Sequence, residues 1–226
     1  RDQRAFVRYL GDLHVATHRL VLRIDDIDIA ALVVAQHRRF GQQWRGRRAG
    51  TDPGTPPRER VLLDTSSRAG ATQAIASYAP SPDGTLVAVM VGEGGGELGR
   101  FAILDVADGR ERYRLDGMTF GDFELFWLAP DLVAYTRMTH APDSGVDPLL
   151  DTQAMVVSLT PQGAVERIGL GNRLEGGPTF APEEFPVIIG PGHGDLVFGY
   201  GFGARADALV LVTSLAALRA GTPTWR

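Results

Sequence analysis

The sequence predicts an all-β protein: a partial β-propeller of about three of seven four-stranded blades, preceded by a short N-terminal segment of uncertain structure. Composition is the first reason, because 28 of the 226 residues are glycine and 14 are proline, gathered between short apolar runs. Such spacing is typical of strands joined by turns. Repetition is the second, because turns with Asp83, Asp131 and Asp195 follow at intervals of 48 and 64 residues. Units recurring at about 40–60 residues are typical of propeller blades.

Composition also excludes several classes of protein. A hydrophobic fraction of 44% and a charged fraction of 22% indicate a folded globular chain. The longest apolar run, Ile29–Ala35, is far shorter than the roughly 18 residues that cross a bilayer, so we expect no membrane partner. Because the chain has no cysteine, disulfides, thiolate zinc sites and a cysteine nucleophile are excluded. Cysteine usage leaves the compartment open, with the cytoplasm preferred to the periplasm.

The sequence begins with Arg1 instead of Met, without the layout of a signal peptide, and its ending Pro223-Thr224-Trp225-Arg226 has no stop signal of its own. Both ends therefore read as cut, and we expect a piece of a longer protein. In residues 1–57, the sequence pattern predicts a strand over His18–Ile24 and a helix from Ile29 to about Phe40, capped by Asp28. An Arg/Gly/Pro-rich linker is expected to follow the helix. Charge sets this segment apart, because residues 1–60 carry +5 and residues 61–226 carry −9.

From residue 58 the pattern changes to strand, turn, strand, and we predict blades at about 60–115, 116–170 and 171–226. After a short apolar run at 61–63, the expected strands are 74–79, 86–91, 101–106 and 112–115; then 123–127, 132–137, 153–159 and 165–168; and finally 179–180, 186–189, 196–200 and 208–214. Ser81-Pro82-Asp83-Gly84 suits a turn, since proline presets φ and glycine accepts a positive φ. A sandwich of hairpins is the alternative fold for these strands.

Two glycine-rich stretches raise the question of a nucleotide cofactor. Gly94-Gly95-Gly96-Glu97-Leu98-Gly99 fits the GxGxxG pattern, but that motif works only where the loop opens a helix. Here another strand pattern follows, which favours a hairpin. Gly199-Tyr200-Gly201-Phe202-Gly203 is interpreted as a glycine/aromatic turn, because it lacks the Lys-Ser/Thr ending of a phosphate loop. We therefore predict no cofactor.

A serine hydrolase of the α/β type needs Gly-x-Ser-x-Gly, because its sharp strand-to-helix elbow leaves no room for larger neighbours. No serine of this chain has glycine two places away on both sides; the seven are Ser66, Ser67, Ser77, Ser81, Ser144, Ser158 and Ser214. His140 and His193 have no nucleophile to activate. The sequence therefore predicts no catalytic residue in these 226 positions.

Metal and nucleic-acid sites are also disfavoured. His14 and His18 have the spacing of neighbours on a helix but lack the glutamate of HExxH, and surface histidines are the preferred interpretation. Three close aspartates, Asp25, Asp26 and Asp28, lack the glycine of a calcium loop and fit a turn or a helix cap. A basic strip interleaves arginines with aromatics, at Arg38, Arg39, Arg45, Arg47 and Arg48 around Phe40 and Trp44. No RNA-binding motif accompanies it, so a solvated linker is preferred, and we expect neither metal nor nucleic acid.

Several stretches carry a family likeness. Arg60–Asp64 precedes Ser77-Tyr78-Ala79-Pro80-Ser81-Pro82-Asp83-Gly84, and Phe126–Asp131 and the ending Ser214–Trp225 follow. With these residues, 60–226 resemble the N-terminal propeller of the prolyl oligopeptidase family of serine peptidases. The likeness covers about three-quarters of the chain, whereas residues 1–57 depart from that family's usual opening, a helix containing tryptophan.

The resemblance implies a function for the whole protein. It implies cleavage of oligopeptides after proline, with a seven-bladed propeller that covers the active site and excludes folded proteins. It places the hydrolase domain, with its serine, aspartate and histidine, beyond Arg226, as a partner in the same polypeptide. Around Phe120 and Phe123, inner-strand residues would face the central cavity, although core packing is the preferred role for both.

Two functions stay open from the sequence. The first is the propeller part of a post-proline serine oligopeptidase, without activity of its own. The second is a stand-alone propeller-like binding module without catalysis. An incomplete ring leaves open sheet faces and strand edges, so we expect the 226-residue chain alone to self-associate.

Overall fold

The computed structural model describes residues 13–16, 19–24, 58–65, 73–93, 97–190, 194–203 and 208–226; for 13–16, 19–24, 58–60 and 93 it describes the backbone only. The described residues form four antiparallel sheets. The first sheet contains β1 (Leu13–Ala16), β2 (Arg19–Ile24) and β3 (Arg58–Asp64). The second contains β4 (Gln73–Pro80), β5 (Leu86–Glu93), β6 (Leu98–Asp105) and β7 (Glu111–Arg114), with β8 (Thr119–Phe120) paired to β6.

The third sheet contains β9 (Phe126–Ala129), β10 (Leu132–Arg137), β11 (Gln153–Thr160) and β12 (Gly163–Leu170). The fourth contains β13 (Phe185–Ile189), β14 (Leu196–Phe202) and β15 (Leu209–Ser214), followed by the helix α1 (Leu215–Ala220). Within the last three sheets, strands adjacent in sequence are hydrogen-bonded neighbours, except that β8 pairs with β6 and not with β7. Antiparallel neighbours of this kind are the ones that the turn-rich sequence predicts.

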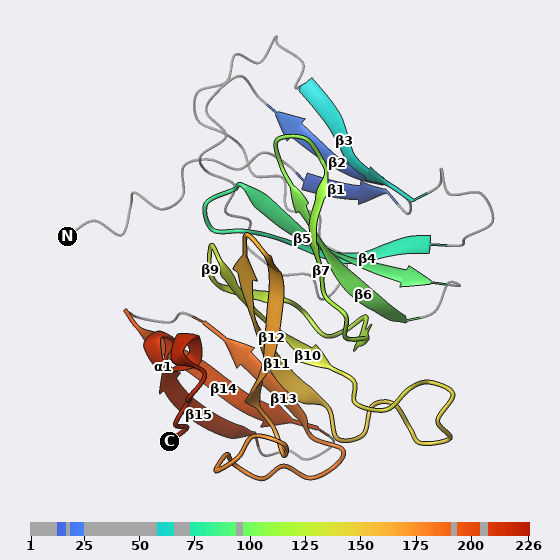
Figure 1. Ribbon diagram of the computed structural model, residues 1–226. Coiled ribbons are helices and arrows are strands. Elements are labelled where there is room, and N and C mark those ends of the chain that lie inside the picture. The colour runs from blue at the N-terminus through green and yellow to red at the C-terminus, as the bar shows by residue number, and fades with distance from the viewer. Residues whose placement is uncertain are drawn as a thin grey trace.

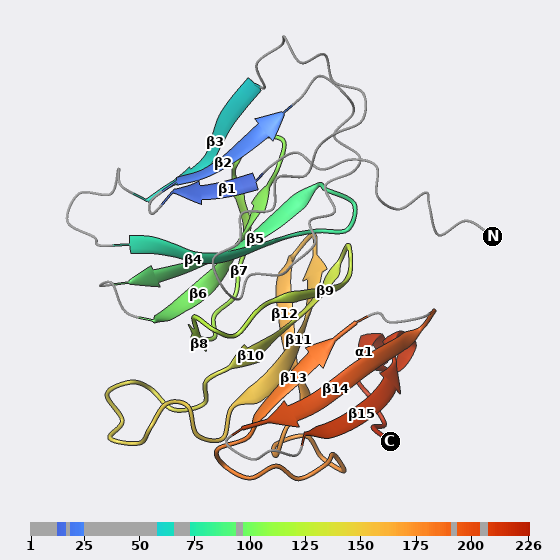
Figure 2. The same cartoon turned by 180° about the vertical axis from the view of Figure 1, so that it is seen from behind.

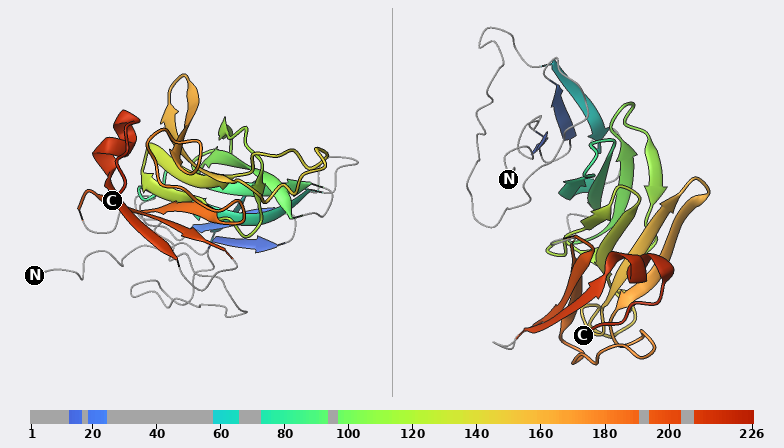
Figure 3. Two further views of the ribbon diagram at one scale, coloured as in Figure 1. Left: turned by 90° about the horizontal axis from the view of Figure 1, so that it is seen from below. Right: turned by 90° about the vertical axis from the view of Figure 1, so that its left-hand side faces the viewer.

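Figure 1 shows the sheets stacked in the order of the chain, from β1–β3 at the top to β13–β15 at the bottom. The view from behind shows the same order, with each sheet facing the next (Figure 2). The right-hand view of Figure 3 places the fourth sheet and α1 at the end of the stack. A sandwich of hairpins would have one apolar layer between two sheets, whereas this stack has several.

Three apolar layers separate the four sheets, and alternation along each strand assigns side chains to them. On β5, Ala88 and Met90 join the layer toward the third sheet, while Val87 and Val89 join the layer toward β3. The third sheet repeats this arrangement, since Val133 of β10 faces the second sheet and Leu132 the fourth. Strands buried on both faces lose the usual polar alternation, which explains why these segments are continuous apolar runs.

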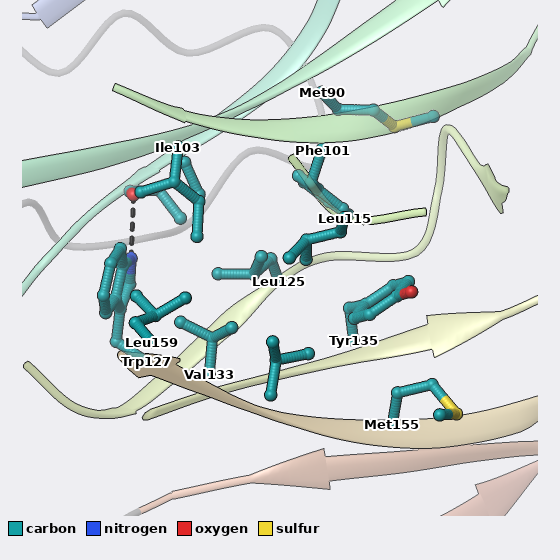
Figure 4. Close-up of a cluster of buried hydrophobic side chains, with 13 residues drawn as sticks. Met90, Phe101, Ile103, Leu115, Leu125, Trp127, Val133, Tyr135, Met155 and Leu159 are labelled. Carbon is teal, nitrogen blue, oxygen red and sulfur yellow. Dashed lines mark hydrogen bonds between the residues drawn. The ribbon is translucent and has the colours of Figure 1, made fainter. Parts of the chain in front are cut away.

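The layer between the second and third sheets holds the largest side chains, including Met90, Phe101 and Tyr135 (Figure 4). The rings of Phe101 and Tyr135 meet edge to face, with centroids 5.9 Å apart. On the opposite side of the layer, the indole Nε1–H of Trp127 donates to the carbonyl of Ala79 at 2.8 Å. This bond joins two sheets through buried atoms, where an unpaired donor is costly.

The strand predictions are largely confirmed, and each turn aspartate lies between the first and second strand of its sheet. Strand β10 has the predicted bounds, 132–137. The third strand of the second sheet begins at Leu98, earlier than the predicted 101, and β9 begins at Phe126 instead of 123. Phe123 lies in a turn, because its N–H donates to the carbonyl of Phe120 at 2.9 Å.

The prediction of a strand at 179–180 is wrong. The amide side chain of Asn172 takes both backbone groups of Phe180: Asn172 Nδ2 donates to the Phe180 carbonyl at 2.9 Å, and the Phe180 N–H donates to Asn172 Oδ1 at 2.7 Å. Groups satisfied in this way have nothing left for a neighbouring strand. The fourth sheet therefore has three strands.

The turn predicted at 199–203 is also wrong, because Gly199 and Gly201 lie inside strand β14. A Cβ at Gly199 would clash with the ring of Trp225, and one at Gly201 with the ring of Phe180. These glycines make room for two rings packed on the strand, which is the close approach that glycine permits.

Helix α1 has no counterpart among the predicted elements, although its ends follow known rules. The Ser214 hydroxyl accepts from the Ala217 N–H at 3.0 Å as the N-cap, and Gly221 ends the helix with φ of 76°. Arg167 donates to the carbonyls of Leu218 and Arg219 at 2.8 and 2.9 Å. A cation at the last helical carbonyls is stabilising, so β12 fixes the helix against the third sheet.

In the N-terminal part, β2 confirms the strand predicted at 18–24. The helix at 29–40 and the linker that follows it lie outside the described residues, as do Asp25, Asp26, Asp28 and the arginine strip. Among the described residues, no helix is long and apolar enough to cross a membrane.

We predict that Trp127→Phe lowers the free energy of unfolding by about 1–3 kcal/mol, because it leaves the buried Ala79 carbonyl without its donor. Trp225→Phe is the matched control, since its indole also donates at 2.8 Å, to Gly169, but from a half-buried position. Urea unfolding of both variants measures the difference. An equal or larger loss for Trp225→Phe would contradict a special role of the bond in Figure 4.

The pair Asp131–Arg219 links the β9–β10 turn to α1, with two hydrogen bonds of 2.6 and 2.8 Å. Arg219 lowers the pKa of Asp131, so its stabilisation is present above the ordinary value of 3.8 and is lost as pH falls through the lowered value. Because the pair is exposed, we predict that Asp131→Asn costs only about 0.2–1 kcal/mol at pH 7. In 1 M NaCl the difference from the wild type should disappear, and its persistence would argue against an electrostatic origin.

Candidate functional surface

The sequence motifs considered for chemistry are dispersed in the structure. Gly94–Gly96 lie outside the described residues, but β5 and β6 pair with Gly92 opposite Gly99, so the predicted hairpin is confirmed. His14 lies in strand β1, which removes the helical spacing to residue 18. His193 and His18 are outside the described residues.

His140 lies in the long connection between β10 and β11, with Nε2 3.7 Å from Asp151 Oδ2. Asp151 has a φ of 55°, a left-handed conformation uncommon for residues other than glycine. Its N–H donates to the Pro182 carbonyl at 2.8 Å, and its carbonyl accepts from Thr139 Oγ1 and Gln153 Nε2. These bonds fix the base of the connection and give Asp151 a structural role.

Aromatic side chains form a continuous row from β8 to β14. The ring centroids of Phe120 and Phe123 are 5.9 Å apart, those of Phe123 and Phe185 5.2 Å, and those of Phe185 and Phe202 5.4 Å. Tyr200 extends the row at 6.1 Å from Phe202. The row thus connects the second sheet with the fourth through the two phenylalanines singled out in the sequence.

Exposure differs along this aromatic row. Phe123 is buried, which agrees with core packing, whereas Phe120, Phe185 and Tyr200 are half-buried and Phe202 is exposed. Burial raises the pKa of Tyr200, and the neighbouring carboxylate of Glu124 raises it further. The row therefore offers apolar faces beside a negative charge, a surface suited to apolar or cationic groups.

A polar network borders the layer between the second and third sheets. The Tyr135 hydroxyl lies 3.1 Å from both carboxylate oxygens of Glu166, and Arg137 Nη1 lies 3.3 Å from Oε2. Burial raises the pKa of Tyr135, and the charge of Glu166 raises it further. Gly117 closes over the network, since a Cβ there would clash with Tyr135 and Arg137.

Sequence reasoning missed this network. Its signal was the alternation of β12, which places Glu166 on the same face as Ile168 and hence toward the buried layer. Using that signal also requires the pairing of Val133 with Val157, which joins β10 to β11 across the long connection between them and so brings Glu166 within reach of β10. Carboxylate, guanidinium and hydroxyl satisfy one another here, as buried polar groups must.

Metal coordination finds no support in the part of the chain that the structure describes, where no three or more histidine, aspartate or glutamate residues cluster suitably. The absence of catalytic and cofactor residues stays a prediction.

Comparison with known proteins shows which solved structures share this fold. No family model matches this sequence, and no curated protein matches it. Solved structures do match, and they define the class of fold as the propeller portion of prolyl endopeptidases. One is from a study of two prolyl endopeptidases and their inter-domain dynamics, with 24% identity, a TM-score of 0.51 and 74% of this chain covered.

A second similar structure is prolyl oligopeptidase B from Galerina marginata, bound to a hydrolysis and macrocyclization substrate. It has 17% identity and a TM-score of 0.51 over 69% of this chain. The same enzyme with a macrocyclization substrate has 16% identity and an equal TM-score. This chain spans 22–23% of the length of these structures.

We predict that Tyr135→Phe makes the free energy of unfolding decrease less between pH 8 and pH 11 than it does in the wild type. In the wild type the raised pKa of Tyr135 keeps the folded state neutral while the unfolded tyrosine ionises near pH 10, so stability is complete below pH 10 and falls above it. Unfolding free energies at pH 8, 9.5 and 11 should fall less steeply for Tyr135→Phe. Equal slopes for the two proteins would refute the link to Tyr135.

Proposed function

We infer that this chain is the propeller part of a serine-type, post-proline oligopeptidase, and that it limits access of substrates to a hydrolase domain supplied by the same polypeptide. The observation that supports this most is the fold likeness to prolyl endopeptidases over 74% of the chain. A chain that matches 22% of such an enzyme fits one part of it.

The physical character of the fold agrees with a gating role. The sheets are held by buried apolar layers, and hydrogen bonds also join neighbouring sheets, such as Trp127 to Ala79 and Thr136 to Pro186. Interiors packed in this way are stiff, and a stiff assembly of sheets can exclude folded domains by size. Gating by size needs stiffness and no reactive group of its own.

The alternative function, a stand-alone binding module, has one observation in its favour. The aromatic row from Phe120 to Tyr200 leaves half-buried rings beside Glu124. Such a surface can hold an apolar or cationic peptide segment without catalysis.

We predict that the complete gene product hydrolyses a glycyl-prolyl amide and reacts with a fluorophosphonate probe for active serines, whereas the 226-residue chain does neither. A ring of seven blades and a hydrolase domain would give the endogenous protein an intact mass of roughly 60–80 kDa. If the endogenous protein has the 24.3 kDa mass of this chain and the probe does not label it, the peptidase proposal is rejected in favour of the binding module.

A further inference from the structure

We propose that Thr136 is a latch, a residue hydrogen-bonded to both neighbouring sheets, and that the stiffness it gives the second, third and fourth sheets sets the size limit of the gate, an inference that rests on the proposed function. Thr136 lies near the end of β10 and is 2% exposed. Its role is that of a positioning residue, because it acts through the sheets and not on a substrate.

The backbone of Thr136 is bonded to the second sheet. Its carbonyl accepts from Thr119 Oγ1 at 2.7 Å, and the N–H of Met138, two residues further on, donates to the Met118 carbonyl at 2.9 Å. Backbone groups two residues apart on a strand point to the same edge. The chain around β8 therefore takes the edge of β10 that β9 leaves open, because β9 pairs with β10 only as far as Ala134.

The side chain of Thr136 is bonded to the fourth sheet. Side chains alternate along β10, so Tyr135 lies in the layer toward the second sheet (Figure 4) and Ala134 in the layer toward the fourth. Thr136 shares the face of Ala134, and its Oγ1 donates to the Pro186 carbonyl of β13 at 2.8 Å. One residue thus joins three sheets, with its carbonyl toward one neighbour and its hydroxyl toward the other.

Burial makes these hydrogen bonds costly to break. Thr119 and Thr136 are both buried, and so are the two bonds they make. A buried carbonyl that loses its donor keeps the whole cost of its desolvation. Apolar contact is non-directional and lets packed sheets slide, whereas a hydrogen bond fixes both distance and direction. The latch therefore adds a restraint that the apolar layers do not supply.

The latch lies at the end of the strands that carries the aromatic row. Thr119 directly precedes Phe120, and Pro186 directly follows Phe185. Phe123 bridges these two rings, with centroid distances of 5.9 Å to Phe120 and 5.2 Å to Phe185. Ring contacts and buried hydrogen bonds thus hold the same sheets at the same end, so loosening the latch should also loosen the spacing of the rings.

Hydrogen exchange of the 226-residue chain tests the latch. Thr136→Val keeps the shape of the side chain and removes its hydroxyl, so we expect amide exchange in β13, on another sheet, to become about fivefold faster or more. Thr136→Ser keeps the hydroxyl and should leave exchange in β13 as in the wild type. Thr160→Val is the matched control, because Thr160 Oγ1 donates to the Gly163 carbonyl at 2.9 Å within one hairpin, and its effect should stay in β11 and β12.

Thr119→Val separates the two halves of the latch. It removes the bond to the second sheet and leaves the Thr136 hydroxyl in place, so exchange should become faster around β8 and stay unchanged in β13. Unchanged exchange in β13 of Thr136→Val, or an equal increase there in Thr160→Val, overturns the latch. Circular dichroism shows which variants fold. If Thr136→Val does not fold, Thr119→Val decides, and unchanged exchange around β8 then overturns the latch.

Hydrolysis by the complete gene product tests the size limit. Thr136→Val should leave kcat/KM for a glycyl-prolyl amide unchanged and raise kcat/KM for a long proline-containing peptide several-fold, because a looser assembly excludes large molecules less well. Thr136→Ser and Thr160→Val should change neither value. A wild type that does not hydrolyse the amide rejects the proposed function, and the exchange experiment still decides the latch. An unchanged ratio of the two kcat/KM values, in a Thr136→Val enzyme whose exchange is faster, rejects the role of the latch in the size limit.

Discussion

The structure depends on face-to-face stacking of antiparallel sheets, in which the strands of the middle sheets bury both sides. Alternate residues of β5, such as Val89 and Met90, enter different apolar layers. A shift of pairing by one residue would exchange the two sets and mismatch both layers at once. Register in the second and third sheets is therefore specified twice, which accounts for their continuous apolar sequences.

Polar contacts lie at the edges of the apolar layers. Trp127 reaches across to the backbone of Ala79, while Tyr135, Glu166 and Arg137 satisfy one another at the other side. The helix α1 is held by Arg167 and by the pair Asp131–Arg219. These contacts join residues between 29 and 88 positions apart. Trp127 joins the second and third sheets, the contacts of α1 hold the helix on the third sheet, and the network at Glu166 joins β10 to β12 within that sheet.

Much of the strand content and the order of the sheets could be predicted from sequence, because hairpins and their turns are local. Strand 132–137 and the turn at Asp83 depend on neighbouring residues alone, and Asp83 indeed accepts from Ser81 Oγ at 2.6 Å. Predictions failed where a contact from outside the strand or turn itself decides the local structure. Phe180 has its backbone bonded to an amide side chain, and Gly199 accommodates a ring from near the C-terminus. The Tyr135–Glu166–Arg137 network required a register that no single segment encodes.

The connection between β10 and β11, which hydrogen bonds hold at its base, suggests a site for protein engineering. Thr139, Asp151 and Pro182 lock its two ends to the body of the protein, while residues 141–147 at its tip are exposed. Lengthening such a loop costs only the entropy of closure, about 0.6 kcal/mol for each doubling. The tip is thus a place where a fluorescent label or a whole reporter domain can be inserted while the stacked sheets keep their registers.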